Sequence, residues 1–533
     1  MTSHLRALAA QVKNDSPAEV DTRVRIPVTD RDHEVNEAAA DELIKVEGVY
    51  VRAGRLVEVV RDDAEVDPLA PVVGELGRHT VRDLLSTRCR FVRRSSGKWV
   101  KVSAPDSVVG RILERRQWPV GVRHLKGVTE TPSMRPDGSL LTQSGYDPKT
   151  GLYLETNLKL DLEALANPTR EDAVNACEQL LEVVCDFPFV KPEARSAWLA
   201  FCLTPFARPA IPGQCPLFLI DGNVPGSGKS RLCDSVAILA SGRAMPRGSA
   251  PPHEEEWRKQ LMSSLEAARQ TVLFDNVAAD FGSPTLDAIL TGPTYTGRVL
   301  GTKEDRTFVA RTIFAATGNN VQVMGDLRRR ALHIRIESDM EKPEDRNDFA
   351  HPDLLTWVTE QRSRLATAAL TVLRAFHIAG RPVQPGRWGS FESWHRLVRG
   401  AIVWAGLPDP DVVRQDMEAS ADPQVVAFRA LLQSWSDVWG GTGLHLGEVL
   451  ERLTPGPGQQ LGEGLKSLRA ALLELCSDRD GGLPSAKALG KQLTKLKGRP
   501  GPGGLKLWAK PGQGGILVWR VATGHEVELP TQG

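Results

Sequence analysis

The residues with the clearest chemical meaning lie in a short glycine-rich segment that follows an apolar run. Residues 223–230 read Asn-Val-Pro-Gly-Ser-Gly-Lys-Ser, directly after the strand-like run PLFLID and before a helical pattern. Glycines let backbone N–H groups turn inward around phosphate oxygens, and the start of a helix adds partial positive charge. The segment therefore predicts a phosphate-binding loop for ATP. The expected cofactor-binding residues are Asn223, Val224, Pro225, Gly226, Ser227, Gly228, Lys229, Ser230 and Arg231.

Two residues of this loop have predicted chemical roles. Lys229 would reach the β- and γ-phosphates, and the Ser230 hydroxyl would bind Mg²⁺. The usual motif has glycine at the position of Asn223, but asparagine tolerates left-handed backbone angles, which would preserve the turn. The alternative is a glycine-rich turn between a strand and a helix that binds nothing.

Two later strand-like runs end in polar residues that suit the same chemistry. The run 271–275 ends in Asp275, the expected second ligand of Mg²⁺, and the run 312–317 leads into Asn319 and Asn320. An amide at that position can orient the water that attacks the γ-phosphate. Ordinary turns at the ends of strands are the alternative interpretation of both.

A basic cluster follows at Arg328, Arg329 and Arg330. An arginine there could reach a neighbouring subunit and stabilise transition-state charge, an effect of about 10³–10⁵ in rate in other phosphoryl-transfer enzymes. We name Arg329 and Arg330 as catalytic candidates, with Lys229, Asp275, Asn319 and Asn320. A solvated basic turn is the alternative.

These residues need a scaffold of several domains. The chain has 533 residues, and apolar strands alternate with helical segments around the loop, which predicts an α/β fold with a mostly parallel sheet. We expect an N-terminal α/β accessory domain (1–160), a helical connector (161–206) and the ATPase core (207–345). After the core we expect a helical domain (346–439), a Gly/Pro-rich linker (440–464), a winged-helix-like domain (465–523) and a tail (524–533).

Composition excludes several classes of protein. Hydrophobic residues at 41% and charged residues at 25% indicate an ordinary globular protein. The seven cysteines include no C-x-x-C pair, which excludes zinc ribbons and suits free buried thiols. Without a long apolar run or a signal sequence, we expect no membrane partner and a cytoplasmic location.

Positive charge collects near the C-terminus although the net charge is only +1. The segment 483–520 holds eight basic residues and no Asp or Glu. Lys487, Lys491 and Lys495 recur at helical spacing, and a Gly-rich turn between strand-like runs follows. The pattern predicts a winged helix that contacts DNA through this helix and through Lys510, with protein binding as the alternative.

With these motifs in view, the chain resembles superfamily 3-type AAA+ helicases of phages, plasmids and other mobile elements. The resemblance implies a ring, usually a hexamer, that hydrolyses ATP at subunit interfaces and moves along single-stranded DNA. It also implies a pore hairpin, for which Arg298, Lys303 and Arg306 are the DNA-binding candidates. We see no metal-binding carboxylates of a primase, so we expect priming to belong to another replication protein.

One residue departs from the AAA+ pattern. Many such ATPases place glutamate after the Mg²⁺-binding aspartate, whereas this chain has Asn276. An amide positions water but cannot accept its proton. Asp280 or one of Glu254, Glu255 and Glu256 would then be the base, or hydrolysis is slow.

The sequence thus favours an ATP-dependent DNA helicase or translocase that binds single- and double-stranded DNA. The alternative is an initiator or loader ATPase that binds DNA but does not unwind it processively. A P-loop phosphotransferase ranks last, because it gives the basic C-terminal segment no role.

Overall fold

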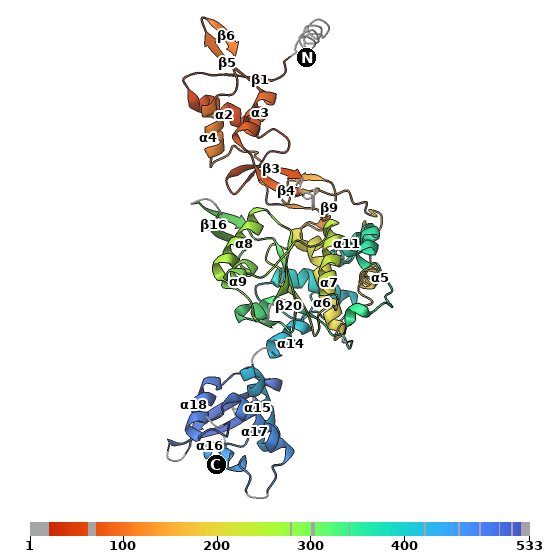
Figure 1. Cartoon of the computed structure of the whole chain (residues 1–533), viewed down its shortest axis with the longest axis vertical. Coiled ribbons are helices and arrows are strands. Elements are labelled where there is room, and N and C mark those ends of the chain that lie inside the picture. The colour runs from red at the N-terminus through yellow and green to blue at the C-terminus, as the bar shows by residue number, and fades with distance from the viewer. Residues whose placement is uncertain are drawn as a thin grey trace. The chain divides into compact units, whose positions relative to one another are not determined.

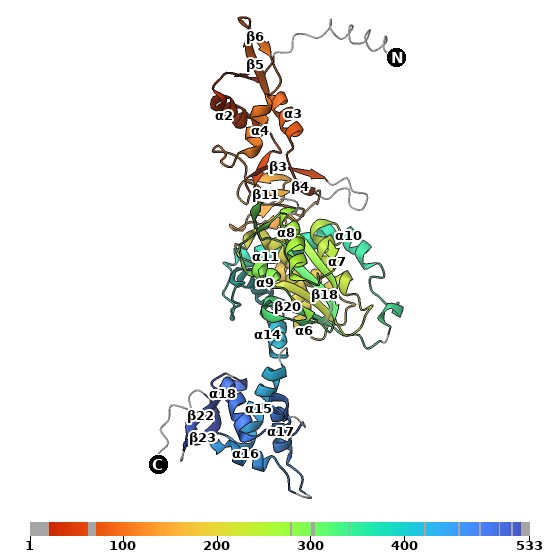
Figure 2. The ribbon, with the colours of Figure 1, turned by 60° about the vertical axis from the view of Figure 1, so that its left-hand side comes forward.

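The computed structural model describes residues 21–61, 71–277, 280–299, 304–340, 342–420, 423–456, 459–478, 481–499, 501–512 and 515–523. The chain divides into two compact units (Figures 1 and 2). The first comprises Met1–Ala278, Gly282–Asn320 and Ile334–Asp409, and the second comprises Ala279–Phe281, Val321–His333 and Pro410–Gly533. Among the described residues, no helix combines the length and apolar character needed to cross a membrane.

The N-terminal part of the first unit has a small sheet covered by three helices. Its strands are in the order β1-β5-β6. Buried apolar side chains, among them Leu43, Val81, Phe91 and Val109, form its core. The elements are β1 (Val24–Pro27), α2 (Asp32–Leu43), α3 (Arg78–Arg88), β5 (Cys89–Ser95), β6 (Lys98–Lys101) and α4 (Asp106–Glu114).

Three further small sheets follow or interrupt this part of the chain. Their orders are β2-β3-β4, β10-β11-β7 and β8-β9. Tyr50 packs against Tyr146 and Tyr153, with ring centroids 5.3 and 6.1 Å apart. The strands are β2 (Tyr50–Arg52), β3 (Arg55–Arg61), β4 (Pro71–Glu75), β7 (Gly127–Thr129), β8 (Ser133–Met134), β9 (Leu140–Leu141), β10 (Gly145–Asp147) and β11 (Leu152–Leu154).

A five-stranded sheet forms the centre of the first unit. Its order is β13-β14-β18-β12-β20, and β13, β14, β18 and β12 pair in parallel. The α/β class and the mostly parallel sheet are therefore confirmed. The strands are β12 (Leu217–Gly222), β13 (Arg247–Gly248), β14 (Thr271–Val277), β18 (Ile313–Asn319) and β20 (Ala331–Ile336).

Helices pack against this sheet through aromatic contacts. Phe201 stacks on Phe218 of β12 with centroids 4.4 Å apart, and Trp257 contacts Phe274 of β14 at 4.8 Å. The indole of Trp198 donates to the carbonyl of Leu232 at 3.2 Å, which ties α6 to α7. The helices are α5 (Arg170–Glu182), α6 (Pro192–Ala207), α7 (Lys229–Ser241), α8 (Glu254–Glu266), α9 (Pro284–Thr291), α10 (Leu354–Glu360), α11 (Arg362–Ile378), α12 (Glu392–Trp394) and α13 (Gly400–Ala405).

The cysteines are free, as predicted, and five of the seven are buried. Cys185 is exposed and Cys476 is partly exposed, so burial holds only for the others.

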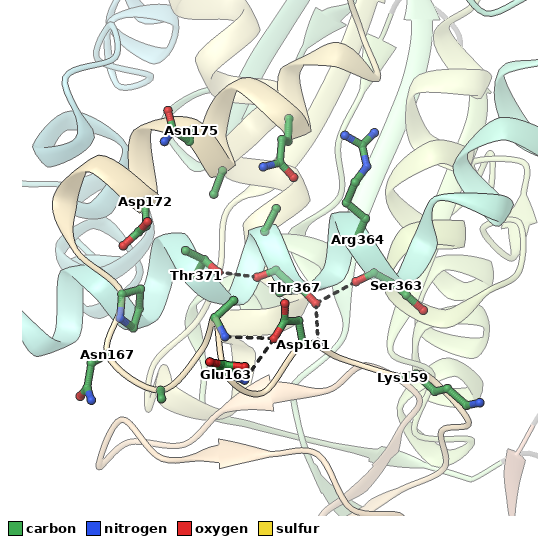
Figure 3. Close-up of a pocket in the computed structure, with 16 residues that line it drawn as sticks. Lys159, Asp161, Glu163, Asn167, Asp172, Asn175, Ser363, Arg364, Thr367 and Thr371 are labelled. Carbon is green, nitrogen blue, oxygen red and sulfur yellow. Dashed lines mark hydrogen bonds between the residues drawn. The ribbon is translucent and has the colours of Figure 1, made fainter.

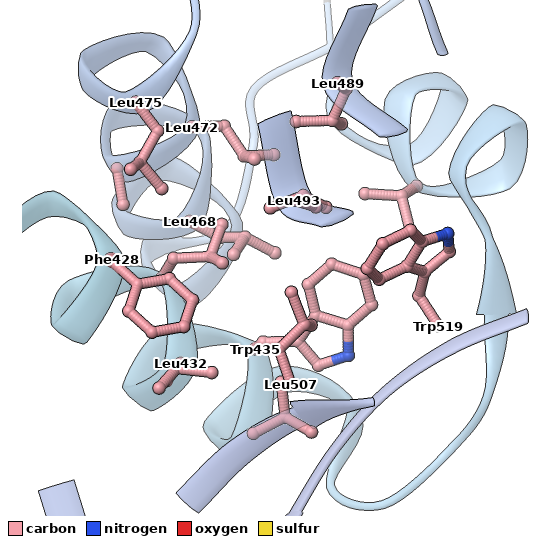
Figure 4. Packing of buried hydrophobic residues seen from close by; sticks show 14 of the residues in the cluster. Phe428, Leu432, Trp435, Leu468, Leu472, Leu475, Leu489, Leu493, Leu507 and Trp519 are labelled. Carbon is pink, nitrogen blue, oxygen red and sulfur yellow. The ribbon is translucent and has the colours of Figure 1, made fainter. Parts of the chain in front are cut away.

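The second unit has its own apolar core, shown in Figure 4, in which Trp435 and Trp519 pack among leucines. Its three-stranded sheet has the order β21-β23-β22 and is antiparallel. The 440–464 stretch, predicted as a linker, contains β21 and α16, and their Leu444, Leu446 and Val449 join the core. The elements are α14 (Val412–Ser420), α15 (Pro423–Trp439), β21 (Leu444–His445), α16 (Leu446–Arg452), α17 (Glu463–Leu475), α18 (Ala486–Leu496), β22 (Leu505–Pro511) and β23 (Leu517–Thr523).

Candidate functional site

The sheet order brings three predicted motifs to one edge. β18 lies between β12, which leads into the glycine-rich loop, and β14, which carries Asp275. Gly222 of β12 lies opposite Asn319 of β18. Because the carboxyl ends of parallel strands share one edge, the loop, the aspartate and the asparagine converge there, where ligands bind in such sheets.

The glycine-rich loop turns at Gly226 and Gly228, whose φ angles are 73° and 88°. A Cβ on Gly228 would lie 2.9 Å from the Phe187 ring, so only glycine fits. Asn223 does not adopt the left-handed conformation, so our reason for tolerating asparagine was wrong. Its side chain instead exchanges two hydrogen bonds with the backbone of Ser338, at 2.8 and 3.0 Å, and braces the loop.

Lys229 begins α7 directly after this loop and is only 9% exposed. Its ammonium donates to the carbonyl of Val224 and to Ser227 Oγ, both at 2.9 Å. Burial lowers the pKa of Lys229, and the nearby charges of Asp221 and Asp275 oppose that shift. The ammonium thus points back over the loop, as a phosphate-binding lysine requires.

Asp275 accepts hydrogen bonds from the two neighbouring motifs. Ser230 Oγ donates to its Oδ1 at 2.9 Å, and Thr317 Oγ1 of β18 donates to the same oxygen at 2.5 Å. Burial raises the pKa of Asp275, but the bonds from Thr317 and Ser230 and the charge of Arg247 outweigh it and hold the pKa below its ordinary value. The carboxylate is therefore ionised at neutral pH.

Arg247 joins this carboxylate to the helix after the loop. It lies on β13 and contacts Asp275 Oδ2 at 3.4 Å. Its other terminal nitrogen donates to both oxygens of Asp234 on α7, at 2.8 and 2.6 Å. This bond to Asp234 is the main cause that raises the pKa of Arg247. Sequence reasoning missed both Arg247 and Thr317.

A β-bulge follows Asp275. The register of β14 on β18 shifts between Phe274 and Val277, and Asn276 has a φ of 52°. The backbone N–H of Asn276 donates to Thr317 Oγ1 at 2.9 Å. The position after Asp275 therefore requires a residue that tolerates left-handed angles, which asparagine does.

The two asparagines at the end of β18, Asn319 within the strand and Asn320 directly after it, have different surroundings. Asn319 Oδ1 is buried and has no hydrogen-bond partner. Asn320 has a φ of 50°, and its Oδ1 accepts from Arg335 at 3.0 Å. Arg335 also pairs with the buried Asp221 at 2.6 Å. Asn319 is thus the one of the two whose side-chain oxygen has no hydrogen-bond partner.

The proposed general bases have partners of their own. Glu254 accepts from Ser283 Oγ at 2.8 Å and from the backbone N–H of Thr285 at 3.0 Å, at the start of α9. These bonds make Glu254 a brace between α8 and α9. The remaining candidates are Glu255 and Glu256, which pair with Lys259, and Asp280, which belongs to the second unit.

Arg329 and Arg330, the candidates for an arginine finger that would reach a neighbouring subunit, lie in the second unit on the 3₁₀ helix η2 (Gly325–Arg330). Both contact Asp326, Arg329 at 2.7 Å and Arg330 at 2.9 Å. The Arg329 side chain remains 59% exposed, whereas that of Arg330 is 12% exposed.

The two strands of the predicted hairpin are β16 (Thr294–Arg298) and β17 (Asp305–Val309), which pair antiparallel. Arg298 is exposed at its end. Arg306 is 12% exposed and lies among carboxylates, Glu266 at 3.5 Å and Glu304 at 3.7 Å. Lys303 lies outside the described residues.

The basic C-terminal segment forms α18, capped by Ser485 as predicted. Its three lysines face solvent, whereas Leu489, Leu493 and Leu496 are buried. Lys510 is exposed on β22. Trp519 lies in the core of this unit, whereas Trp508 is partly exposed beside Lys506.

A pocket of about 230 Å³ adjoins the glycine-rich loop. Phe187, Phe349 and His351 contribute rings to its lining, and Arg231 contributes a charge. A nucleotide with its phosphates in the loop has room for its base here.

A second pocket, of about 750 Å³, lies between α5 and α11 (Figure 3). Thr367 accepts from the backbone of Asp161 at 3.2 Å, and Thr371 donates to the Thr367 carbonyl at 2.9 Å. Asp172 completes the capping box of α5. These polar groups serve the local fold, and we assign the pocket no ligand.

Comparisons with known proteins give distant likenesses only. No protein-family model and no curated protein sequence matches the chain. Similar solved structures include the apo form of the NrS-1 C-terminal region, with 10% identity and a TM-score of 0.39 over 91% of this chain and 98% of that one. Another is the SCCmec type IV Cch active helicase, with 11% identity and a TM-score of 0.30 over 82% of this chain and 95% of that one. A third is the JCV helicase, with 14% identity and a TM-score of 0.19 over 51% of this chain and 73% of that one. Likeness at these values carries no functional argument, so function is argued from the site itself.

Proposed function

We propose that this protein binds and hydrolyses ATP at the edge of the five-stranded sheet. The observation that carries the proposal is the hydrogen bond between Ser230 Oγ and Asp275 Oδ1, which joins the loop to the neighbouring motif. Lys229 lies beside it, and Asn319 offers a buried, unpartnered oxygen from the strand between them.

The donor set at this site fits Mg²⁺. Ser230 and Asp275 present hard oxygen ligands 2.9 Å apart, and Mg²⁺ is commonly held by one or two protein oxygens together with phosphates. The ion would neutralise charge on the β- and γ-phosphates. The base and ribose would occupy the pocket lined by Phe187 and His351.

We further propose that the motor is an AAA+ ATPase of the superfamily 3 type, arranged as a hexameric ring. Arg329 is the better finger, because it is far more exposed than Arg330 and can reach a neighbouring copy. Arg298 is the hairpin residue that remains available for DNA. The winged-helix-like unit would contact DNA through Lys487, Lys491 and Lys495.

On this basis the protein is an ATP-dependent DNA helicase or translocase that serves replication of a mobile element. The test is strand displacement on a forked duplex with ATP and Mg²⁺. Wild type should displace the strand, Lys229→Ala should not, and Lys149→Ala, which removes an exposed lysine paired with Asp137, should match wild type.

The assay also separates the alternative. DNA-stimulated hydrolysis without displacement, on forks of either polarity, would favour the initiator or loader. Absence of both ATP binding and hydrolysis would refute the ATPase.

A further inference from the structure

A cationic hairpin in the N-terminal part of the first unit has no role in the proposed ATPase. Between Arg88 and Lys101 the sequence holds six basic residues and no Asp or Glu. β5 and β6 form this hairpin, and the two residues between them, Ser96 and Gly97, have φ angles of 48° and 79°. Two successive left-handed residues form the turn that matches the twist of paired strands. Local geometry therefore holds the hairpin in one register.

One face of the hairpin combines an aromatic ring with cations. Arg94 lies directly opposite Trp99, and directly opposite residues share a face. Lys101 shares it too, two positions along β6. The Arg25 guanidinium of β1 lies over the Trp99 ring, 4.8 Å from its centroid. The face thus presents an indole among three cations.

This face is accessible and its charge is uncompensated. All residues from 93 to 101 are exposed, and Trp99 retains 48% exposure despite Arg25. The nearby Asp21 pairs with Arg23 at 2.8 Å and Arg90 at 3.5 Å. The three cations of this face, Arg25, Arg94 and Lys101, have no ion-pair partner among the described residues, and neither have Arg93 and Lys98 on the opposite face of the hairpin.

We propose that the β5–β6 hairpin is a binding surface for single-stranded nucleic acid. The cations would hold the phosphates, and a base would stack on the exposed part of Trp99. A duplex keeps its bases stacked on one another and offers no free ring to the indole. An acidic protein would use the charge but would leave the ring unexplained. The surface is distinct from the hairpin β16–β17 and from α18.

The first test is photocrosslinking of the full-length protein, without nucleotide, to an oligothymidylate of about 15 nucleotides that carries 5-bromodeoxyuridine. We expect a DNA adduct on the peptide that contains Trp99. If unlabelled duplex reduced the adduct as strongly as unlabelled single strand, the single-strand assignment would be overturned. The same holds if anionic vesicles reduced the adduct and unlabelled DNA did not. Absence of an adduct would overturn the site.

The second test measures affinity for the same oligonucleotide. Trp99→Ala should weaken binding about 5- to 150-fold where this surface dominates, and Trp99→Phe should restore most of it. Arg94→Ala with Lys101→Ala, two cations of the face that carries Trp99, should reduce the slope of log K against log salt by about 1.4. The matched control is Arg78→Ala with Arg111→Ala, which removes two exposed arginines that already have carboxylate partners in the same region. An equal change in this control would refute the role of the hairpin.

These outcomes do not depend on ATP hydrolysis. Loss of the adduct with ATPase activity intact would refute only the hairpin, and loss of ATPase activity with the adduct intact would refute only the proposed motor.

Discussion

Arg247 should tune Asp275, the carboxylate that we propose binds Mg²⁺. It contacts Asp275 at 3.4 Å and makes two short bonds to Asp234, whose side chain is only 8% exposed. The informative change is Arg247→Ala. It removes the charge between the two carboxylates and leaves the loop intact.

The cost in stability follows from the bonds to Asp234. Breaking a fully buried pair costs about 3–5 kcal/mol, because a charge is left without a partner. The Arg247 side chain is 42% exposed, so in the variant water can take over part of its hydrogen bonding to Asp234. We therefore expect a loss of about 1–2 kcal/mol in the free energy of unfolding. Asp234→Asn with Arg247→Ala should cost less than the sum of the single changes.

The effect on activity follows from Asp275. Its pKa lies below the ordinary value, so its ionised form, and the stability that depends on it, is lost only as pH falls through that low pKa. Without the arginine the pKa rises, and protonation begins at higher pH. The acid limb of the ATPase pH profile should therefore move to higher pH.

The assay is ATP hydrolysis against Mg²⁺ concentration at several pH values. Arg243→Ala is the control, because Arg243 pairs with Glu130 instead of Asp275. An acid limb in Arg247→Ala that coincides with those of wild type and Arg243→Ala would refute the electrostatic link. A loss of activity that is equal at every pH would also contradict it.

Three further changes test the same site. Thr317→Val should raise the pKa of Asp275 and move the acid limb in the same direction as Arg247→Ala, which a pH profile measures. Asn319→Ala should slow hydrolysis by about 10²-fold with little change in ATP binding, as seen in single-turnover rates and nucleotide titration. Arg329→Ala should reduce the rate by about 10³-fold or more, and addition of Lys229→Ala protein, which supplies an intact arginine, should restore part of it in mixed rings. Equal loss in Arg330→Ala would argue against Arg329 as the finger.

The local motifs could be predicted because each depends on neighbouring residues. Strand, glycines and lysine are contiguous around Lys229, and Asn319 ends the apolar strand β18 as predicted, whereas β14 continues two residues beyond Asp275 to Val277. Ser485 could be identified as a cap for the same reason.

The partners of these residues could not be predicted, because they depend on strand order. Arg247 and Thr317 reach Asp275 only because β13 and β18 flank β14. A single sequence does not fix that order. Asn223 shows a different limit: its type suggested a left-handed backbone, whereas its side chain bonds to Ser338, far along the chain.

The bulge within β14 gives a structural reason for an asparagine after Asp275. The N–H of Asn276 donates to Thr317 Oγ1, whose hydroxyl donates to Asp275, so the backbone at 276 orients the carboxylate through the threonine. That geometry needs a φ of 52°, which asparagine tolerates and glutamate strongly disfavours. The backbone conformation at position 276 thus accounts for an asparagine there without a catalytic role for its side chain. Under the proposed function, orientation of the attacking water would fall to Asn319, whose side-chain oxygen Oδ1 on the adjacent strand is buried without a hydrogen-bond partner.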